Sequence, residues 1–150
     1  MKRVIVFVLA LAMLISNAAV GFHPTIVSAM QAEPKKDLKI GMIVPTLGAQ
    51  FWANSVDFAK RGAEELGFEL VVFNADNKAD QINKLIEDAI ASGIDGLIFV
   101  PYWSAGRKAV MDCEAAGIPI ITIDCFIEDI EPQDAFANYI AFIGPNDEDA

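Results

Sequence analysis

The chain has 150 residues, of which 54% are hydrophobic and 21% are charged, and its formal net charge is −10. This length allows one domain with its own core, and the hydrophobic content excludes an intrinsically disordered chain. The acidic balance argues against a nucleic-acid-binding protein, because such proteins need a basic surface.

The first residues have the pattern of a secretory signal peptide. Lys2 and Arg3 precede an uninterrupted apolar run over residues 4–15, which is short for a membrane-spanning helix. Small residues after this run offer cleavage sites. We therefore expect a signal peptide over residues 1–32, a polar leader over 33–37 and an exported mature protein, which the resemblance described below places in the periplasm. The alternative is an uncleaved membrane anchor. No cysteine lies near the cleavage region, so no lipid anchor is expected.

From residue 38 onward, short apolar runs alternate with amphipathic segments. Strands are expected over 38–44, 68–74, 95–100, 118–124 and 139–144, and helices over 51–66, 79–92 and 104–116. Glycines follow each helix as stops, and Ser104 is the expected N-cap of the third helix. The apolar stripe of the first helix is expected to contain Val56, Ala59, Ala63 and Leu66. Strands that alternate with helices predict right-handed βαβ crossovers and a doubly wound, mostly parallel α/β sheet.

Two cysteines, Cys113 and Cys125, occur in the part expected to be exported. Cys113 falls on the apolar face of the third helix, whereas Cys125 lies just beyond the far end of the strand that follows. Most of a strand's length separates them, on the order of 15 Å at about 3.3 Å per residue. A disulfide needs Cα atoms within about 7 Å. We therefore expect free thiols, with Cys113 in the core and Cys125 near the rim.

The motifs of several enzyme classes are missing. The single histidine, His23, lies inside the expected signal peptide, so the mature chain would lack Ser-His or Cys-His pairs and histidine-bound metals. No G-x-G-x-x-G fingerprint or P-loop follows the first strand, and no G-x-S-x-G elbow occurs. We therefore expect no catalytic site, no metal and no cofactor.

The carboxyl ends of the expected strands carry large aromatic residues. In open parallel α/β sheets, ligands bind beyond these ends. An aromatic face packs against the C–H face of a sugar, and a carboxylate accepts hydrogen bonds from its hydroxyls. The candidate ligand-binding residues are Phe51, Trp52, Tyr102, Trp103 and Asp124.

Each candidate also has a purely structural interpretation. Phe51, in the first turn of a helix, is expected more in the core than in a pocket. Trp52 lies beside the apolar stripe rather than on it, which favours the pocket. Tyr102 and Trp103 could equally cover the strand edge. Asp124 ends an apolar strand, so either a backbone donor or a ligand must satisfy its carboxylate.

Five segments in order carry a resemblance to a known family: KIGMIVPTLGAQFW, GAEELGFELVVFNAD, QINKLIEDAIASGIDGLIFVP, AAGIPIITIDC and YIAFIGPNDEDA. They resemble the type I periplasmic binding proteins, most of all the ribose/galactose-type sugar-binding branch of ABC transporters. The resemblance covers about residues 38–150. It implies the strand order 2-1-3-4-5 and two lobes that close on a ligand. The sequence stops where that family begins the next helix, so we expect the truncated N-terminal lobe of such a protein, with one face of the last strand uncovered.

The resemblance also implies roles for the candidate residues. Trp52, often together with Phe51, would stack on the sugar, and Asp124 would accept its hydroxyls. Three positions depart from the ribose-type pattern, which has a basic residue and two asparagines where this chain has Cys125, Ala49 and Val100. These differences favour another sugar, a cyclic polyol or a small signalling molecule.

The expected function is the substrate-binding component of an ABC-type transport system, which delivers a sugar-like solute to a membrane permease. The alternative is a periplasmic sensory receptor of the same fold, which presents a small signal molecule to a membrane kinase or chemoreceptor. An exported enzyme is supported by no set of residues.

Overall fold

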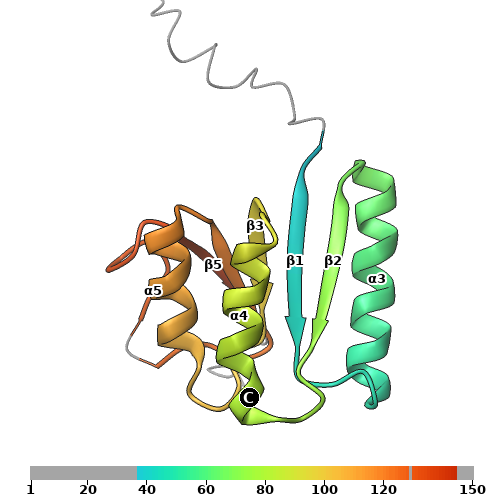
Figure 1. Ribbon diagram of the computed structural model, residues 1–150, viewed down its shortest axis with the longest axis horizontal. Helices are drawn as coiled ribbons and strands as arrows, with labels where there is room; N and C mark the ends of the chain where they lie inside the picture. The colour runs from blue at the N-terminus through green and yellow to red at the C-terminus, as the bar shows by residue number, and fades with distance from the viewer. Residues whose placement is uncertain (1–36, 129, 145–150) are drawn as a thin grey trace, which may run out of the picture. The chain divides into compact units, whose positions relative to one another are not determined.

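The computed structural model describes residues 37–128 and 130–144, so the expected signal peptide lies outside the described residues, as does most of the leader. The elements run in the order β1 (Lys39–Val44), α3 (Gln50–Leu66), β2 (Glu69–Asn74), a 3-10 turn (Ala79–Gln81), α4 (Ile82–Ala91), β3 (Gly96–Phe99), α5 (Gly106–Ala116), β4 (Ile120–Ile123) and β5 (Tyr139–Ile143) (Figure 1). Each expected strand and helix is present, with ends shifted by a few residues at most.

The five strands form one sheet in which every neighbouring pair is parallel. Their order is β2-β1-β3-β4-β5, which confirms the doubly wound arrangement expected from the sequence. Because all pairs are parallel, the carboxyl ends of the strands meet at one edge of the sheet, toward which β1 and β2 point downward in Figure 1. The loops that follow the strands therefore share that edge.

One face of the sheet packs against α4 and α5, which Figure 1 shows in front of the strands. Strand residues such as Ile43, Phe99 and Ile120 form a single cluster there with Ile86 of α4 and Cys113 of α5. Cys113 is 0% exposed, and both cysteines are free, with Cys125 partly exposed. The expected free thiols, one in the core and one near the rim, are confirmed.

The other face packs against α3 in a smaller cluster. Met42, Val44 and Val100 from β1 and the end of β3 contact Trp52 and Val56 of that helix. Toward β5 this face opens, because no described helix covers it, as expected for one face of the last strand. Ile143 is 59% exposed where β5 pairs with β4.

Two expectations for helix ends were wrong. Ser104 does not cap α5, because Trp103 and Ser104 both adopt left-handed backbone, and Ala105 takes the N-cap position without a side-chain cap bond. Leu66 is 77% exposed instead of lying on the buried stripe. Leu66 is the last residue of α3, directly before Gly67, where the chain turns toward β2.

None of the helices in the described part of the chain has the length and apolarity needed to span a bilayer.

Candidate functional site

Four aromatic side chains form a continuous row at the carboxyl edge of the sheet. Phe51 contacts Trp52, Trp52 contacts Tyr102, and Tyr102 contacts Trp103, with ring centroids 4.8, 5.9 and 5.7 Å apart and planes nearly perpendicular. Edge-to-face geometry is a favourable arrangement for aromatic pairs. The first turn of α3 supplies two of the rings and the loop after β3 supplies the other two. The structure therefore brings together all four aromatic candidates from the sequence.

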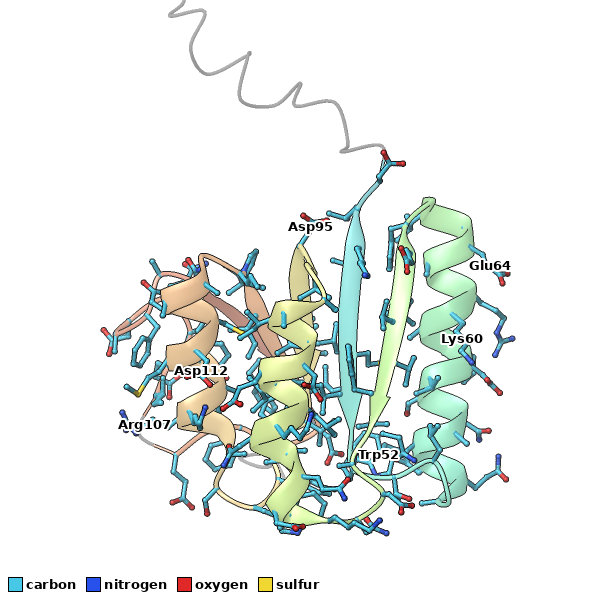
Figure 2. All side chains as sticks on the ribbon, viewed as in Figure 1. Trp52, Lys60, Glu64, Asp95, Arg107 and Asp112 are labelled. Carbon is cyan, nitrogen blue, oxygen red and sulfur yellow. The ribbon has the colours of Figure 1, made fainter. Side chains whose placement is uncertain are left out.

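The two aromatic residues of α3 have the opposite burial to the expected one. Trp52 is 6% exposed and packs in the cluster beneath α3, whereas Phe51 is 61% exposed. The reason is helical spacing, because Trp52 lies one turn before the buried Val56 and so belongs to the apolar stripe. Figure 2 shows Trp52 at the start of α3, beside the lower ends of β1 and β2. Phe51 therefore presents an open ring, and Trp52 supports it.

Asp124 is held by two side-chain donors. The Tyr102 hydroxyl donates to Asp124 Oδ2 at 3.1 Å, and the Cys125 thiol donates to the same oxygen at 3.3 Å. The sequence predicted that a backbone donor or a ligand would satisfy this carboxylate. In the structure, side chains from the loops after β3 and β4 donate to it in place of the expected backbone donor, and its contact with a ligand stays a prediction. Asp124 thus joins the aromatic row through Tyr102.

The neighbourhood of Asp124 keeps its two donors protonated. Burial first, and then the charge of Asp124, raise the pKa of the Tyr102 hydroxyl to about 12. Burial first, and then the hydrogen bond to Asp124, raise the pKa of the Cys125 thiol to about 11. At neutral pH both groups therefore carry a proton to donate, and neither adds a negative charge.

Asn74 shapes the rim of the site from the end of β2. Its Oδ1 accepts hydrogen bonds from the backbone N–H groups of Leu47 at 3.2 Å and Asp76 at 3.1 Å. The loop after β1 is thereby tied to the loop after β2. Lys78 forms an exposed ion pair with Asp76 at 3.0 Å. These residues act in turns, which is a common use of Asn and Asp.

A shallow cavity of about 230 Å³ lies between the start of α5 and the loop after β4, and sequence reasoning missed it. A Cβ on Gly106 would lie 2.7 Å from Ile127 Cγ1, so glycine is needed for this close approach. Figure 2 shows Arg107 at this end of α5. The residues that line the cavity are Pro101, Ser104, Gly106, Arg107, Phe126, Ile127 and Glu128. Phe126, two residues after Asp124, was the available sequence signal.

Over residues 37–128 and 130–144, no group of three or more His, Cys, Asp or Glu side chains is arranged to hold a metal ion.

The sequence model of one family, described as "Periplasmic binding protein domain", matches residues 40–148. This chain belongs to the periplasmic binding protein family. The match covers most of the chain, and it agrees with the strand order and with the resemblance drawn from the sequence, which places the chain among the type I members of the sugar-binding branch.

Individual relatives of this periplasmic binding protein chain agree with that placement. The chain is 27% identical over 125 residues to the ribose import binding protein RbsB of Bacillus subtilis strain 168, covering 83% of this chain and 41% of that protein. A solute binding protein of Actinobacillus succinogenes 130z, solved with bound D-allose, superimposes with a TM-score of 0.61 at 28% identity, covering 71% of this chain and 38% of that one. The chain therefore spans less than half the length of these relatives and corresponds to part of one N-terminal lobe.

A transcription regulator is also similar to this chain. The arabinose metabolism transcriptional repressor of Halalkalibacterium halodurans is 29% identical over 80 residues, covering 48% of this chain and 21% of that protein. Similarity to this family therefore does not by itself distinguish a transport role from a regulatory one.

Proposed function

We propose that this chain is the N-terminal lobe of the substrate-binding component of an ABC-type transport system. It binds a sugar-like small solute and delivers it to a membrane permease. The observation that carries this proposal is the row of four aromatic rings beside the carboxylate of Asp124 at the carboxyl edge of the sheet. Relatives named for ribose import and a relative solved with D-allose support the solute class.

The open ends of the row suit a sugar. Phe51 is 61% exposed and Trp103 is 42% exposed, so each presents apolar ring surface that a sugar's C–H face can cover. Trp52 and Tyr102 lie between them and fix their positions through edge contacts. Asp124 supplies the acceptor for hydroxyl donors. Phe51, Trp103 and Asp124 are the proposed ligand contacts, with Trp52 and Tyr102 as their support.

The proposed site needs a second surface. Small-molecule sites bury about 70–90% of their ligand, which a flat edge on one lobe does not achieve. The relatives are more than twice as long as the part matched here. We propose that a second lobe closes over the solute, and that a cleaved signal peptide over residues 1–32 directs the protein to the periplasm.

The test is isothermal titration calorimetry of the full-length protein with D-ribose, D-xylose, D-allose, D-glucose, L-arabinose and myo-inositol. We expect at least one of them to bind, and Phe51→Ala to weaken that binding about tenfold through loss of the ring contact. The matched control is Phe58→Ala on the same helix, because Phe58 is 66% exposed but distant from the edge, with Arg61 over its ring. No binding by any of the six, or equal losses in both variants, would contradict the proposal.

The second candidate function is a periplasmic sensory receptor for a small signal molecule. Cys125 beside Asp124 and the tryptophan at position 103 give an edge more aromatic and less basic than the ribose-type pattern, which favours a different ligand. Uptake of the labelled solute by cells with and without the gene separates the two. Loss of uptake supports transport, whereas unchanged uptake with a lost response to the solute supports sensing.

A further inference from the structure

The carboxylate of Asp124 is held from one side only. Both side-chain donors, the Tyr102 hydroxyl and the Cys125 thiol, meet Oδ2, at 3.1 and 3.3 Å. Among the residues that the structure describes, no group donates to Oδ1. Asp124 is partly exposed, so this second oxygen is not sealed in the core. One oxygen of the carboxylate is therefore used by the protein, and the other remains as an acceptor.

The backbone of Asp124 shows that its position is specifically maintained. Its φ is 70°, a left-handed conformation that is uncommon for residues other than glycine. Its backbone N–H donates to the carbonyl oxygen of Ile143 in the neighbouring strand at 3.0 Å, which anchors the turn to the sheet. Strained backbone that is held by its surroundings is concentrated at functional sites. The turn thus carries a carboxylate that two side chains then orient.

The three residues bring no cation of their own. Asp124 brings a carboxylate, and Tyr102 and Cys125 are neutral donors at neutral pH, because the same carboxylate helps to keep them protonated. No salt bridge to Asp124 occurs within the described residues. Lys78, in the loop after β2, pairs with Asp76. The negative charge of Asp124 is thus not neutralised by an ion pair within the described residues.

We propose that Tyr102 and Cys125 are positioning residues that fix Asp124 as a one-sided acceptor, so that the site takes a solute presenting hydroxyl or ammonium donors and rejects a solute with a carboxylate or phosphate at that point. This inference rests on the proposed function and names its ligand class. Tyr102 then acts through its hydroxyl as well as through its ring. Cys125 acts as a donor and not as a nucleophile, since its thiol is held protonated.

The first test needs no knowledge of the solute. In the full-length protein with Cys113→Ala, Cys125 is alkylated with neutral iodoacetamide and with anionic iodoacetate, and the ratio of the two rates is measured. The ratio cancels the fraction of thiolate and reports the local charge. We expect Asp124→Asn to lower this ratio about threefold or more, because removal of the charge admits the anionic reagent. The control Asp112→Asn, on α5 beside Lys108, should leave it unchanged. An unchanged ratio in Asp124→Asn would overturn the rejection of anions.

The second test uses binding. We expect Tyr102→Phe to weaken the neutral sugar that binds in the calorimetric panel about fivefold or more, through loss of a charge-assisted hydrogen bond. The matched control is Tyr139→Phe, which removes a hydroxyl bonded to buried Thr122 at 2.7 Å, away from the edge. Cys125→Ser, which keeps a donor, should bind more tightly than Cys125→Ala. D-Glucuronate should bind at least about tenfold more weakly than D-glucose.

These results distinguish failure of the positioning role from failure of the proposed function. If a neutral sugar binds but Tyr102→Phe and Tyr139→Phe change its affinity equally, the positioning role falls and the proposed function stands. If D-glucuronate binds as tightly as D-glucose, the ligand class is wrong. If no sugar binds, the proposed function falls, while the alkylation ratio still decides whether Asp124 repels anions.

Discussion

Left-handed backbone occurs at both edges of the sheet, but at different kinds of residue. At the amino edge, left-handed backbone occurs at glycines that end a helix shortly before a strand: Gly67, Gly93 and Gly117, with φ of 76, 74 and 69°. At the carboxyl edge, it occurs at residues with side chains, in the loops after β2, β3 and β4: Asp76, Asn77, Trp103, Ser104 and Asp124, with φ between 54 and 70°. A sixth such residue, Gln133, lies in the segment before β5.

This difference separates structural from functional demands. A left-handed residue with a Cβ costs about 1–2 kcal/mol, less for Asp and Asn. At the amino edge the chain only has to turn, so glycine avoids that cost. At the carboxyl edge the strain is retained, and it places an indole ring and a carboxylate in fixed positions. Two of these five residues, Trp103 and Asp124, belong to the candidate site, in keeping with the concentration of backbone strain at functional sites.

The polar groups of the two edges differ in the same way. At the amino edge the backbone N–H of Lys39 donates to Asp95 Oδ2 at 2.9 Å, and its ammonium donates to the carbonyl of Ser92 at 2.9 Å. At this edge, polar groups of the protein therefore bond to one another. At the carboxyl edge, Asp124 shares one oxygen with two protein donors and keeps the other. One edge is internally satisfied, and the other retains capacity for a ligand.

The largest expected effect comes from the support beneath the carboxyl edge. Trp52→Ala should lower the free energy of unfolding by about 3–5 kcal/mol, because a 6% exposed indole leaves a cavity between α3 and the sheet. Urea denaturation measures this loss. Phe51→Ala, at the neighbouring exposed position, should change stability by less than about 1 kcal/mol. Equal losses in the two variants would show that burial does not divide their roles.

Gly117→Ala tests the amino edge. We expect a loss of about 1–2 kcal/mol, because alanine at a φ of 69° is strained. A Cβ at this position would meet no atom within 4 Å, so the loss would report backbone conformation alone. Thermal unfolding of the variant measures it. A neutral result would mean that the turn after α5 relaxes freely.

The buried thiol of Cys113 makes the stability of the fold depend on pH. Burial, and then Asp112, raise the pKa of Cys113 from 9.0 to about 12, so the folded state keeps a proton that the unfolded state releases above pH 9. Stability from this group is therefore complete below pH 9 and falls as the pH rises from 9 to 12. At pH 9.5 the effect is about 1 kcal/mol or less. Denaturant unfolding between pH 8 and 9.5 should show a shallower decline in Cys113→Ala, and identical slopes would contradict the assignment.

Ser104→Gly should have the smallest effect. Glycine relieves the left-handed strain at a φ of 62° but gives the unfolded chain more freedom, and the two contributions nearly cancel. We expect a change within about 0.5 kcal/mol by thermal unfolding. A loss as large as that of Gly117→Ala would show that the Ser104 side chain stabilises the loop, and the contrast between the edges would weaken.

The sequence predicted the sheet well because its signals are local and repeated. Apolar runs and glycine stops marked each strand and helix, and the family resemblance supplied the strand order that pairing then confirmed. The prediction that Ser104 caps α5 failed because a serine before a helix is a good N-cap only with extended backbone angles, which the sequence does not show. The prediction for Leu66 failed because periodicity does not tell at which residue of a helix the packing against the sheet ends.

The sequence predicted which residues gather at the carboxyl edge, but not how they are arranged there. The five candidates lie together at that edge, and their contact with a ligand stays a prediction. Which of Phe51 and Trp52 is buried depends on the rotation of α3 about its axis. One partner of Asp124, Tyr102, comes from a loop 22 residues away in sequence. Such contacts leave no periodic signal.

The chain has two tryptophans, Trp52 and Trp103, and the ring of Tyr102 contacts both of them. The side chain of Trp52 is 6% exposed and that of Trp103 is 42% exposed. The tryptophan fluorescence of these 150 residues therefore originates entirely at the carboxyl edge. The sheltered indole should emit at shorter wavelength than the wetter one, so the spectrum of Trp52→Phe and that of Trp103→Phe should lie on opposite sides of the parent spectrum. Any solute that settles against this edge would change the emission, which makes the chain its own optical sensor without an added label.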